Sequence, residues 1–271
     1  MPNEHVTAEG GGGEAAASLD GRPPVLVMQG ISKRFGAVQA LTDVDFEVYP
    51  GEVVALVGDN GAGKSTLIKC VAGVHSADEG RILVEGTEVK IHTPSDATHL
   101  GIETVYQDLA LCDNLDVVAN MFLGREPADP GGVGPLQELE MEKRSLDILD
   151  GLQVTTIPSV RQAVASLSGG QRQSVAISRA VMWEARIVIL DEPTAALGVA
   201  QTAQVLALIR RLREQGLGVV VITHNLHEVF EVADRIVVLR LGRRVATFAH
   251  AETTPEDVVA AITGARGGLP R

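Results

Sequence analysis

Short apolar runs recur along the chain and predict β-strands, whereas longer stretches with apolar residues every three or four positions predict helices. The predicted strands lie at 25–31, 41–49, 52–58, 81–84, 102–106, 186–190, 218–223 and 235–240. The predicted helices lie at about 64–72, 137–150, 169–183, 199–215, 225–232 and 254–263. Strands alternate with helices in the second half of the chain, which predicts a parallel sheet with helical crossovers. The adjacent strands 41–49 and 52–58, and the pair near 81–90, favour antiparallel pairing.

Two stretches depart from this alternation. Residues 1–24 are polar and contain four consecutive glycines, Gly10 to Gly13, which predicts a disordered leader before a folded domain over 25–271. Residues 109–183 lack a clear strand pattern, so we expect a helical insertion between the two halves of a mixed sheet. The fold class is therefore α/β.

The composition agrees with a sheet covered by helices. Aromatic residues make up 3% of the 271 residues and apolar residues 45%, so the core must be built from Val, Ile, Leu and Ala, as in buried parallel strands. The formal net charge of −12 argues against a broad nucleic-acid surface. Cys70 and Cys112 form no disulfide framework. No apolar run is long enough to span a bilayer and no signal-peptide pattern is present, so we expect a soluble chain that can dock on a membrane protein.

A phosphate-binding loop lies at 58–66, where a strand leads into GDNGAGKST and then into a helix-like run. This matches G-x-x-x-x-G-K-[ST], in which backbone N–H groups and a helix N-terminus surround phosphates. Lys64 would reach the terminal phosphates and the Ser65 hydroxyl would bind Mg²⁺. The predicted nucleotide-binding residues are Gly58, Asn60, Gly61, Ala62, Gly63, Lys64, Ser65 and Thr66. The alternative is an incidental glycine-rich turn.

Two carboxylates follow the buried strand RIVIL, in the sequence RIVILDE at 186–192. At the carboxyl end of a strand in an open α/β sheet, Asp191 would hold Mg²⁺ and Glu192 would orient or deprotonate a water molecule. A helix cap or a salt bridge is the structural alternative. The strand VVVITHN ends in His224, for which we expect contact with the γ-phosphate, although a histidine after a strand is more often structural.

A second phosphate-binding helix start lies at LSGGQ, residues 167–171. Ser168 can cap the following helix, while Gly169 and Gly170 leave its N-terminus open to an anion. One nucleotide rarely needs two such loops from the same subunit. The pattern therefore favours two copies arranged head to tail, each contributing one loop to each nucleotide.

With these motifs in this order, residues 25–250 resemble the ATP-binding subunit of an ABC transporter. The resemblance implies that Phe35, in KRFG, stacks on adenine and that Gln107, in VYQD, contacts Mg²⁺ and the attacking water. It assigns Ser168, Gly169, Gly170 and Gln171 to the partner's ATP, and Glu192, His224 and Gln107 to catalysis. The implied fold is a P-loop NTPase of the ABC ATPase type with an antiparallel β-subdomain and a helical subdomain. Its cofactors are ATP and Mg²⁺.

The amino-acid sequences of three segments, 106–126, 192–199 and 227–244, resemble those of the ATPases of bacterial sugar importers of the ribose/xylose/fructose group. The single cassette is similar to the fructose-type systems. The resemblance implies an ATPase coupled to carbohydrate transport at the cytoplasmic face of the bacterial inner membrane. Its partners would be a second copy, integral membrane permease subunits and, indirectly, a periplasmic or lipid-anchored sugar-binding protein. Leu109 to Leu115 would line the groove for the permease, unless they are an ordinary loop.

Two other functions fit the same motifs: a soluble ABC ATPase outside transport, and a regulatory subunit that binds ATP without hydrolysing it. The long coiled-coil insertion of repair ATPases and the second cassette of translation ATPases are not seen in this sequence. Glu192 argues against a binding-only subunit. Gly198 stands where an aspartate is more usual in this family, so communication between two sites would use backbone or neighbouring groups.

Overall fold

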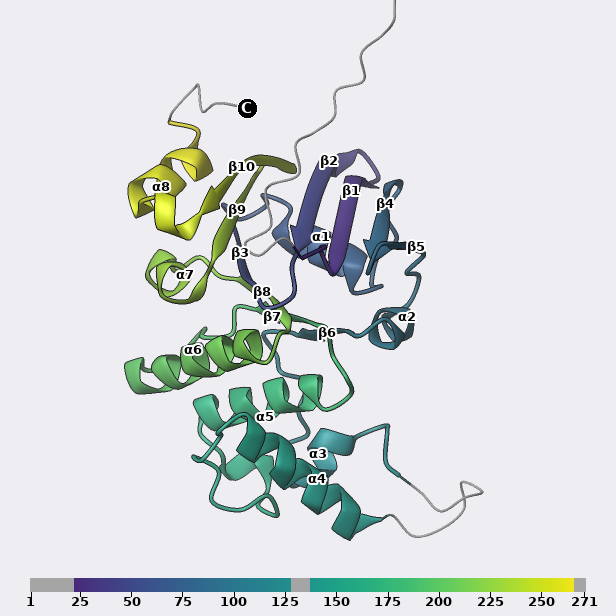
Figure 1. Cartoon of the computed structure of the whole chain (residues 1–271), viewed down its shortest axis with the longest axis vertical. Coiled ribbons are helices and arrows are strands. Elements are labelled where there is room, and N and C mark those ends of the chain that lie inside the picture. The colour runs from purple at the N-terminus through teal and green to yellow at the C-terminus, as the bar shows by residue number, and fades with distance from the viewer. Residues whose placement is uncertain (1–21, 128–136, 266–271) are drawn as a thin grey trace, which may run out of the picture.

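The computed structural model describes residues 22–127 and 137–265. Two sheets occupy one end of the elongated molecule and a group of helices the other (Figure 1). Most of the predicted leader, residues 1–21, lies outside the described residues, and Arg22 to Pro24 have no regular structure.

Within the described residues, a six-stranded sheet has the order β10-β9-β3-β8-β7-β6. Neighbouring strands from β9 to β6 run parallel, and β10 pairs antiparallel with β9. The bounds are β3 Val53–Val57, β6 Ile102–Val105, β7 Ile187–Asp191, β8 Gly218–Ile222, β9 Arg235–Arg240 and β10 Arg243–Ala249. Every residue of β3 and β8 is buried, which explains their unbroken apolar sequences.

Alternate residues of β3 face the two sides of this sheet. Val54 and Leu56 pack in a core shared with the helix after the phosphate loop and with the second sheet. Val53 packs on the opposite side with Val205, and so under the helices of the second half of the chain. Helices and a second sheet thus cover the central strands on both faces.

The second sheet is antiparallel, with the order β2-β1-β4-β5. Its strands are β1 Leu26–Phe35, β2 Val38–Val48, β4 Glu79–Val84 and β5 Thr87–Val89. The predicted antiparallel pairing near 81–90 is confirmed. The predicted pairing of 41–49 with 52–58 is wrong, because β2 pairs with β1 whereas β3 joins the parallel sheet. The residues of β3 are apolar throughout and suit a strand covered on both faces, which β2 is not.

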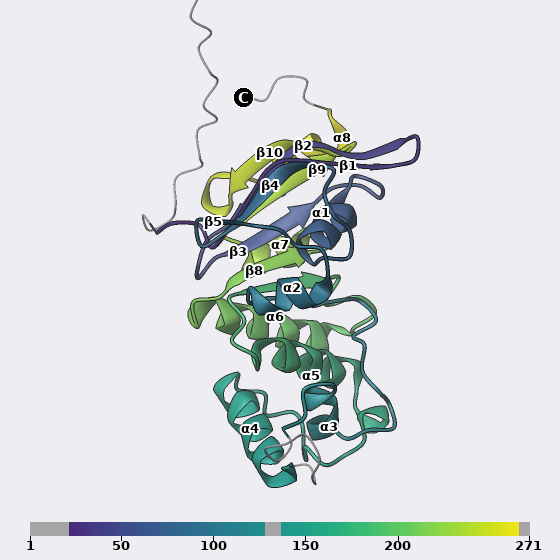
Figure 2. The same ribbon diagram turned by 90° about the vertical axis from the view of Figure 1, so that its right-hand side faces the viewer.

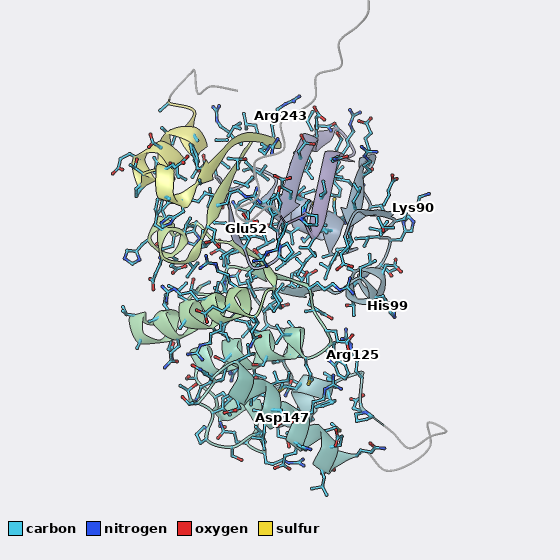
Figure 3. The ribbon with its side chains drawn as sticks, viewed as in Figure 1. Glu52, Lys90, His99, Arg125, Asp147 and Arg243 are labelled. Carbon is cyan, nitrogen blue, oxygen red and sulfur yellow. The ribbon has the colours of Figure 1, made fainter. Side chains whose placement is uncertain are left out.

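A buried ion pair fixes the connection between the sheets, where Figure 3 labels Glu52. The Arg235 Nε and Nη2 atoms donate to Glu52 Oε1 at 2.7 Å and Oε2 at 2.9 Å. Glu52 also accepts from the Tyr49 backbone N–H at 3.0 Å, and Arg235 donates to the Glu47 carbonyl at 2.8 Å. The bidentate pair therefore ties the β2–β3 turn to the start of β9.

Helices cover the parallel sheet and form the other end of the molecule. Their bounds are α1 Lys64–Val71, α2 Pro94–His99, α3 Val117–Phe122, α4 Glu138–Gly151, α5 Gly169–Val181, α6 Val199–Glu214, α7 Leu226–Val232 and α8 Pro255–Thr263, with 3₁₀ turns at η1 Val164–Ser166 and η2 His250–Glu252. Two views at right angles show α3 and α4 at the end farthest from the antiparallel sheet, with α5 and α6 between (Figures 1 and 2). Among the described residues, 109–183 contribute α3, α4, η1 and α5.

Each predicted strand and helix has a counterpart in the structure, and the elements without a predicted range are mostly short. No range of their own was predicted for β5, β10, α2 and α3, although the predicted pair near 81–90 covers β5. β5 has three residues and α2 and α3 six each, too few for a periodic pattern. None of the described helices is long and apolar enough to cross a lipid bilayer.

Candidate functional site

The turn between β3 and α1 has a backbone that only glycine fits at two positions. Gly58 has φ 148°, and a Cβ there would lie 2.2 Å from the Leu239 carbonyl oxygen. Gly63 has φ 105°, and a Cβ would lie 2.9 Å from the Ala40 carbonyl oxygen. The loop is therefore closely packed between β9 and β2, while Asn60 is exposed.

The Lys64 side chain curls back over this loop. Its ammonium donates to the carbonyl oxygens of Gly58 at 2.6 Å and Asp59 at 3.1 Å. Burial lowers the pKa of Lys64, while the nearby charges of Glu192, Asp59 and Asp191 act to raise it. Three carboxylates around one ammonium show that the loop and the end of β7 share one electrostatic site.

Asp191 is the last residue of β7 and Glu192 follows it. Burial is the main cause of the raised pKa of Asp191, the Glu192 charge adds to it, and Lys69 and Lys64 oppose it. Glu192 has φ 50°, a strained conformation for this residue type, and its N–H donates to the Ile222 carbonyl at 2.9 Å. Its carboxylate lies 3.0 Å from His224 Nδ1.

The candidate residues gather because their strands are neighbours. β3, β8, β7 and β6 are adjacent and parallel, so their carboxyl ends share one edge. Gln107 is exposed and follows β6, whose Val105 is opposite Leu190. The Asp191 charge is one cause, after burial, of the raised pKa of Tyr106.

Oxygen donors of the kind that Mg²⁺ prefers stand in the first turn of α1 and at the end of β7. The exposed Ser65 hydroxyl lies in the first turn of α1, and the Asp191 carboxylate interacts with lysines of the same helix. In the described part of the chain, no group of three or more His, Cys, Asp or Glu side chains gathers as a metal site. The protein therefore fits a Mg²⁺ ion that shares its coordination with phosphate oxygens.

Phe35 ends β1 and is 43% exposed. Its ring meets His75 edge-on with centroids 5.1 Å apart, and Lys33 Nζ lies 5.5 Å from its centroid. The ring offers an exposed aromatic surface beside the segment that follows α1, as stacking on a base requires.

Ser168 caps α5 as predicted. The Gln171 N–H donates to Ser168 Oγ at 3.3 Å, and the Ser168 N–H donates to Gln171 Oε1 at 2.8 Å. The Gln171 side chain also donates to the Thr156 carbonyl, so it is occupied with contacts inside its own chain. Ser168 and Gly169 remain exposed at the helix start.

The start of α5 lies against the start of α6. A Cβ on Gly169 would lie 2.9 Å from Leu197 Cδ2, and a Cβ on Gly170 would lie 3.0 Å from Gln201 Cβ. Gly198 itself is the N-cap of α6, with φ −76° and ψ 163° and open space where a side chain would stand. The two glycines of LSGGQ thus permit close packing against the segment that follows Glu192.

Arg179, near the other end of α5, was missed by the sequence analysis. Its guanidinium donates to the Ala110 carbonyl at 2.8 Å and the Leu109 carbonyl at 2.9 Å, two residues with positive φ that follow Gln107. Burial lowers the pKa of Arg179, and the charge of Glu103 opposes the shift. A lone arginine within the apolar run VAISRAVMW was the available signal.

The segment Leu109 to Leu115, which is expected to line the permease groove, also has side chains packed against the core. Leu109 and Leu111 pack against buried residues of α5 and α6. A cavity of about 140 Å³ lies beside it and is lined by Glu103, Thr104, Val105, Met121, Leu123, Arg125, Ala176, Arg179, Ala180 and Trp183. Figure 3 labels Arg125, which pairs with Glu103 at 3.2 Å.

Comparison with known proteins gives one consistent group. The family model described as ABC transporter matches residues 41–195. The fructose import ATP-binding protein of Rhizobium meliloti is 49% identical over 247 residues, covering 90% of this chain and 95% of that protein. The xylose/arabinose import ATP-binding protein of Sulfolobus acidocaldarius is 46% identical over 239 residues, covering 88% and 94%.

The similar solved structures are also ATP-binding cassettes. The ADP conformation of an ATP-binding cassette of an ABC transporter has a TM-score of 0.74 at 27% identity, covering 89% of this chain and 96% of that one. A dimeric ATP-binding cassette in a post-hydrolysis state, bound to ADP and Pi, has a TM-score of 0.68 at 26% identity, covering 83% and 98%.

Proposed function

Because this chain belongs to the ABC transporter ATP-binding family, we propose that it is the ATP-hydrolysing subunit of a bacterial sugar importer. The carrying observation is the shared edge of β3, β8, β7 and β6, where the Glu192–His224 pair stands beside the phosphate loop. The two relatives above are named as sugar import ATP-binding proteins. Their names favour an importer over a soluble ATPase or a regulatory subunit.

The phosphates of ATP would bind at the loop and the first turn of α1. Backbone N–H groups from Gly58 to Thr66 and the Lys64 ammonium supply the donors, and the helix N-terminus adds its partial positive charge. Lys64 would exchange its two backbone carbonyl partners for phosphate oxygens. Phe35 would stack on the adenine.

Hydrolysis would be carried by three side chains at the strand ends. Glu192 would orient the attacking water and accept its proton, while His224 holds the carboxylate and reaches the γ-phosphate. Ser65, Asp191 and Gln107 would hold Mg²⁺, which when bound neutralises charge on the phosphates. The Glu192 charge and the buried position of Asp191 fit a site that receives a cation.

The LSGGQ segment would serve the ATP of a second copy. Ser168 and Gly169 are exposed at the capped helix start and Gly170 is buried beside them, while the Gln171 side chain would act through the cap. We infer a head-to-tail dimer that closes on two ATP molecules. The dimeric relative bound to ADP and Pi supports this arrangement.

The remaining partners would be permease subunits at the cytoplasmic face of the bacterial inner membrane and, through them, a sugar-binding protein outside. We infer that 25–271 act as one ATP-binding domain in which 109–183 form the helical subdomain. The cavity beside Arg125 and Trp183, between β6, α3 and α5, would take part in permease docking. Ion pairing by Glu103 and Arg125 gives that cavity charges of both signs.

The decisive experiment replaces Glu192 with Gln. We expect Glu192→Gln to keep ATP binding, to lose about 10²–10⁴-fold in turnover as for removal of a general base, and to accumulate as an ATP-bound dimer. Lys64→Ala should instead weaken ATP binding itself, measured by nucleotide titration. Normal turnover in Glu192→Gln would contradict the assigned role.

A further inference from the structure

We propose that Glu228 is a positioning residue for ATP hydrolysis, which holds the turn after Glu192 and the turn containing His224 in one fixed arrangement. The proposal rests on the function proposed above. Glu228 lies in the first turn of α7, behind the candidate catalytic pair, and is 7% exposed. None of the ion pairs found among the described residues includes it.

The Glu228 carboxylate is held by neutral donors from both turns. Its Oε2 accepts from the Thr194 hydroxyl at 2.5 Å and the Thr223 hydroxyl at 3.3 Å. Its Oε1 accepts from Asn225 Nδ2 at 2.9 Å. Thr194 lies two residues after Glu192, while Thr223 and Asn225 flank His224. One buried carboxylate therefore bridges both catalytic segments.

The catalytic pair needs such a support because its histidine is mostly exposed and its glutamate has a strained backbone. The His224 side chain is 78% exposed and that of Glu192 20%. Glu192 also has the strained backbone at φ 50°, which persists only where surrounding contacts hold it. Beyond the single backbone bond from Glu192 to Ile222, the bonds to Glu228 are the polar ties between the turns that are shielded from water.

The Glu228 carboxylate acts only as an acceptor in these bonds. All three partners donate to Glu228, and the Thr223 oxygen also accepts from the Asn225 N–H at 3.1 Å. A glutamine at 228 would either direct its NH₂ group at the NH₂ of Asn225 or, turned over, direct it at the Thr194 and Thr223 hydroxyls, which would then have to accept instead of donate. An aspartate at 225 would offer an oxygen that accepts from the NH₂ of a glutamine at 228. Its other oxygen could still accept from the His227 N–H, as Asn225 Oδ1 does at 3.1 Å.

Exchanging donor and acceptor between residues 225 and 228 tests whether Glu228 positions the catalytic segments or is merely a buried residue of the fold. We would measure kcat, KM for ATP, nucleotide affinity and thermal unfolding for Glu228→Gln, Asn225→Asp and the double variant. We expect each single change to lower kcat by about 10–10²-fold, as for a misplaced catalytic group, with nucleotide affinity retained. The double variant should recover most of kcat.

The matched control is Glu231→Gln on the same helix, which changes only surface contacts, with Arg210 at 2.6 Å and His227 at 4.0 Å, and should keep its kcat. Thr194→Val, which keeps the side-chain shape, gives a second reading if Glu228→Gln does not fold. Unchanged kcat in Glu228→Gln or in Thr194→Val, or a double variant no better than the singles, would overturn the proposal. If the unmodified chain itself fails to hydrolyse ATP, the proposed function is at fault instead.

Discussion

Gly198 offers a direct test of how α6 begins. Replacing it with aspartate places a carboxylate at the N-cap, where the backbone already has the extended geometry of a cap, and open space is available for the side chain. The Gln201 side chain would continue to accept from the N–H of residue 198, at 3.4 Å now. The substitution therefore adds a cap without removing a contact.

The expected gain can be assembled from its parts. Aspartate improves on glycine as a cap by a few tenths of a kcal/mol, and its charge at a helix N-terminus adds about 0.3–1 kcal/mol. Loss of the glycine's freedom in the unfolded chain adds about 0.4–1 kcal/mol, because φ −76° suits an ordinary residue. A net gain of about 1–2 kcal/mol should raise the Tm by about 2–8 °C.

Thermal unfolding followed by circular dichroism measures this gain, with Gly198→Ala as the control that shares the backbone effect but has no cap. ATP turnover is measured on the same samples. We expect turnover near that of the unmodified chain, because Glu192 and His224 are untouched. A lower Tm for the aspartate variant than for the alanine variant would refute the description of the α6 start, and a large rise in turnover would show that a missing carboxylate limits the reaction.

Three further predictions follow from the site. Ser168→Arg should leave ATP binding by each chain intact and block ATP-dependent dimerisation, and an ATP-dependent dimer in sedimentation would contradict the head-to-tail arrangement. Arg179→Met should destabilise the fold by about 2–3 kcal/mol in denaturant unfolding, since two carbonyls lose a charged donor, whereas Arg210→Met at the surface should have little effect. The raised folded-state pKa of Asp191 means that its protonated form favours folding and that this contribution is lost as pH rises through that pKa. Asp191→Asn should therefore raise the Tm at neutral pH and not at acidic pH; an equal rise at both would contradict the pKa shift.

Much of the site could be predicted because the residues suited to bind phosphate or to act as a base directly follow strands with a clear apolar pattern. The apolar strands β3, β7 and β8 each end in a recognisable motif, and parallel strands place such ends on one edge. Arg179 and Glu228 could not be found in this way. Each acts through backbone carbonyls or hydroxyls of distant segments, and those pairings exist only after the chain has folded.

The fold errors have similar causes. The wrong pairing of 41–49 with 52–58 came from their closeness in sequence, although the buried pair of Glu52 and Arg235 turns the chain from one sheet into the other. α2 did carry a signal, since Thr93 and Asp96 form a capping box with Pro94 at the first helical position, but its six residues bury one side chain. α3, by contrast, buries five of its six residues, but six residues are too few to show a helical period in the sequence.

Helix α5 carries LSGGQ at its start and Arg179 near its end. Its 13 residues span roughly 20 Å as a straight rod. On the proposed roles, the start of α5 contacts the nucleotide of the neighbouring subunit, and the end of the same helix supports the segment after Gln107. A tilt of α5 would move both ends together. On these roles, a permease that shifts the Gln107 segment would also change the contacts of LSGGQ with the ATP bound to the opposite subunit.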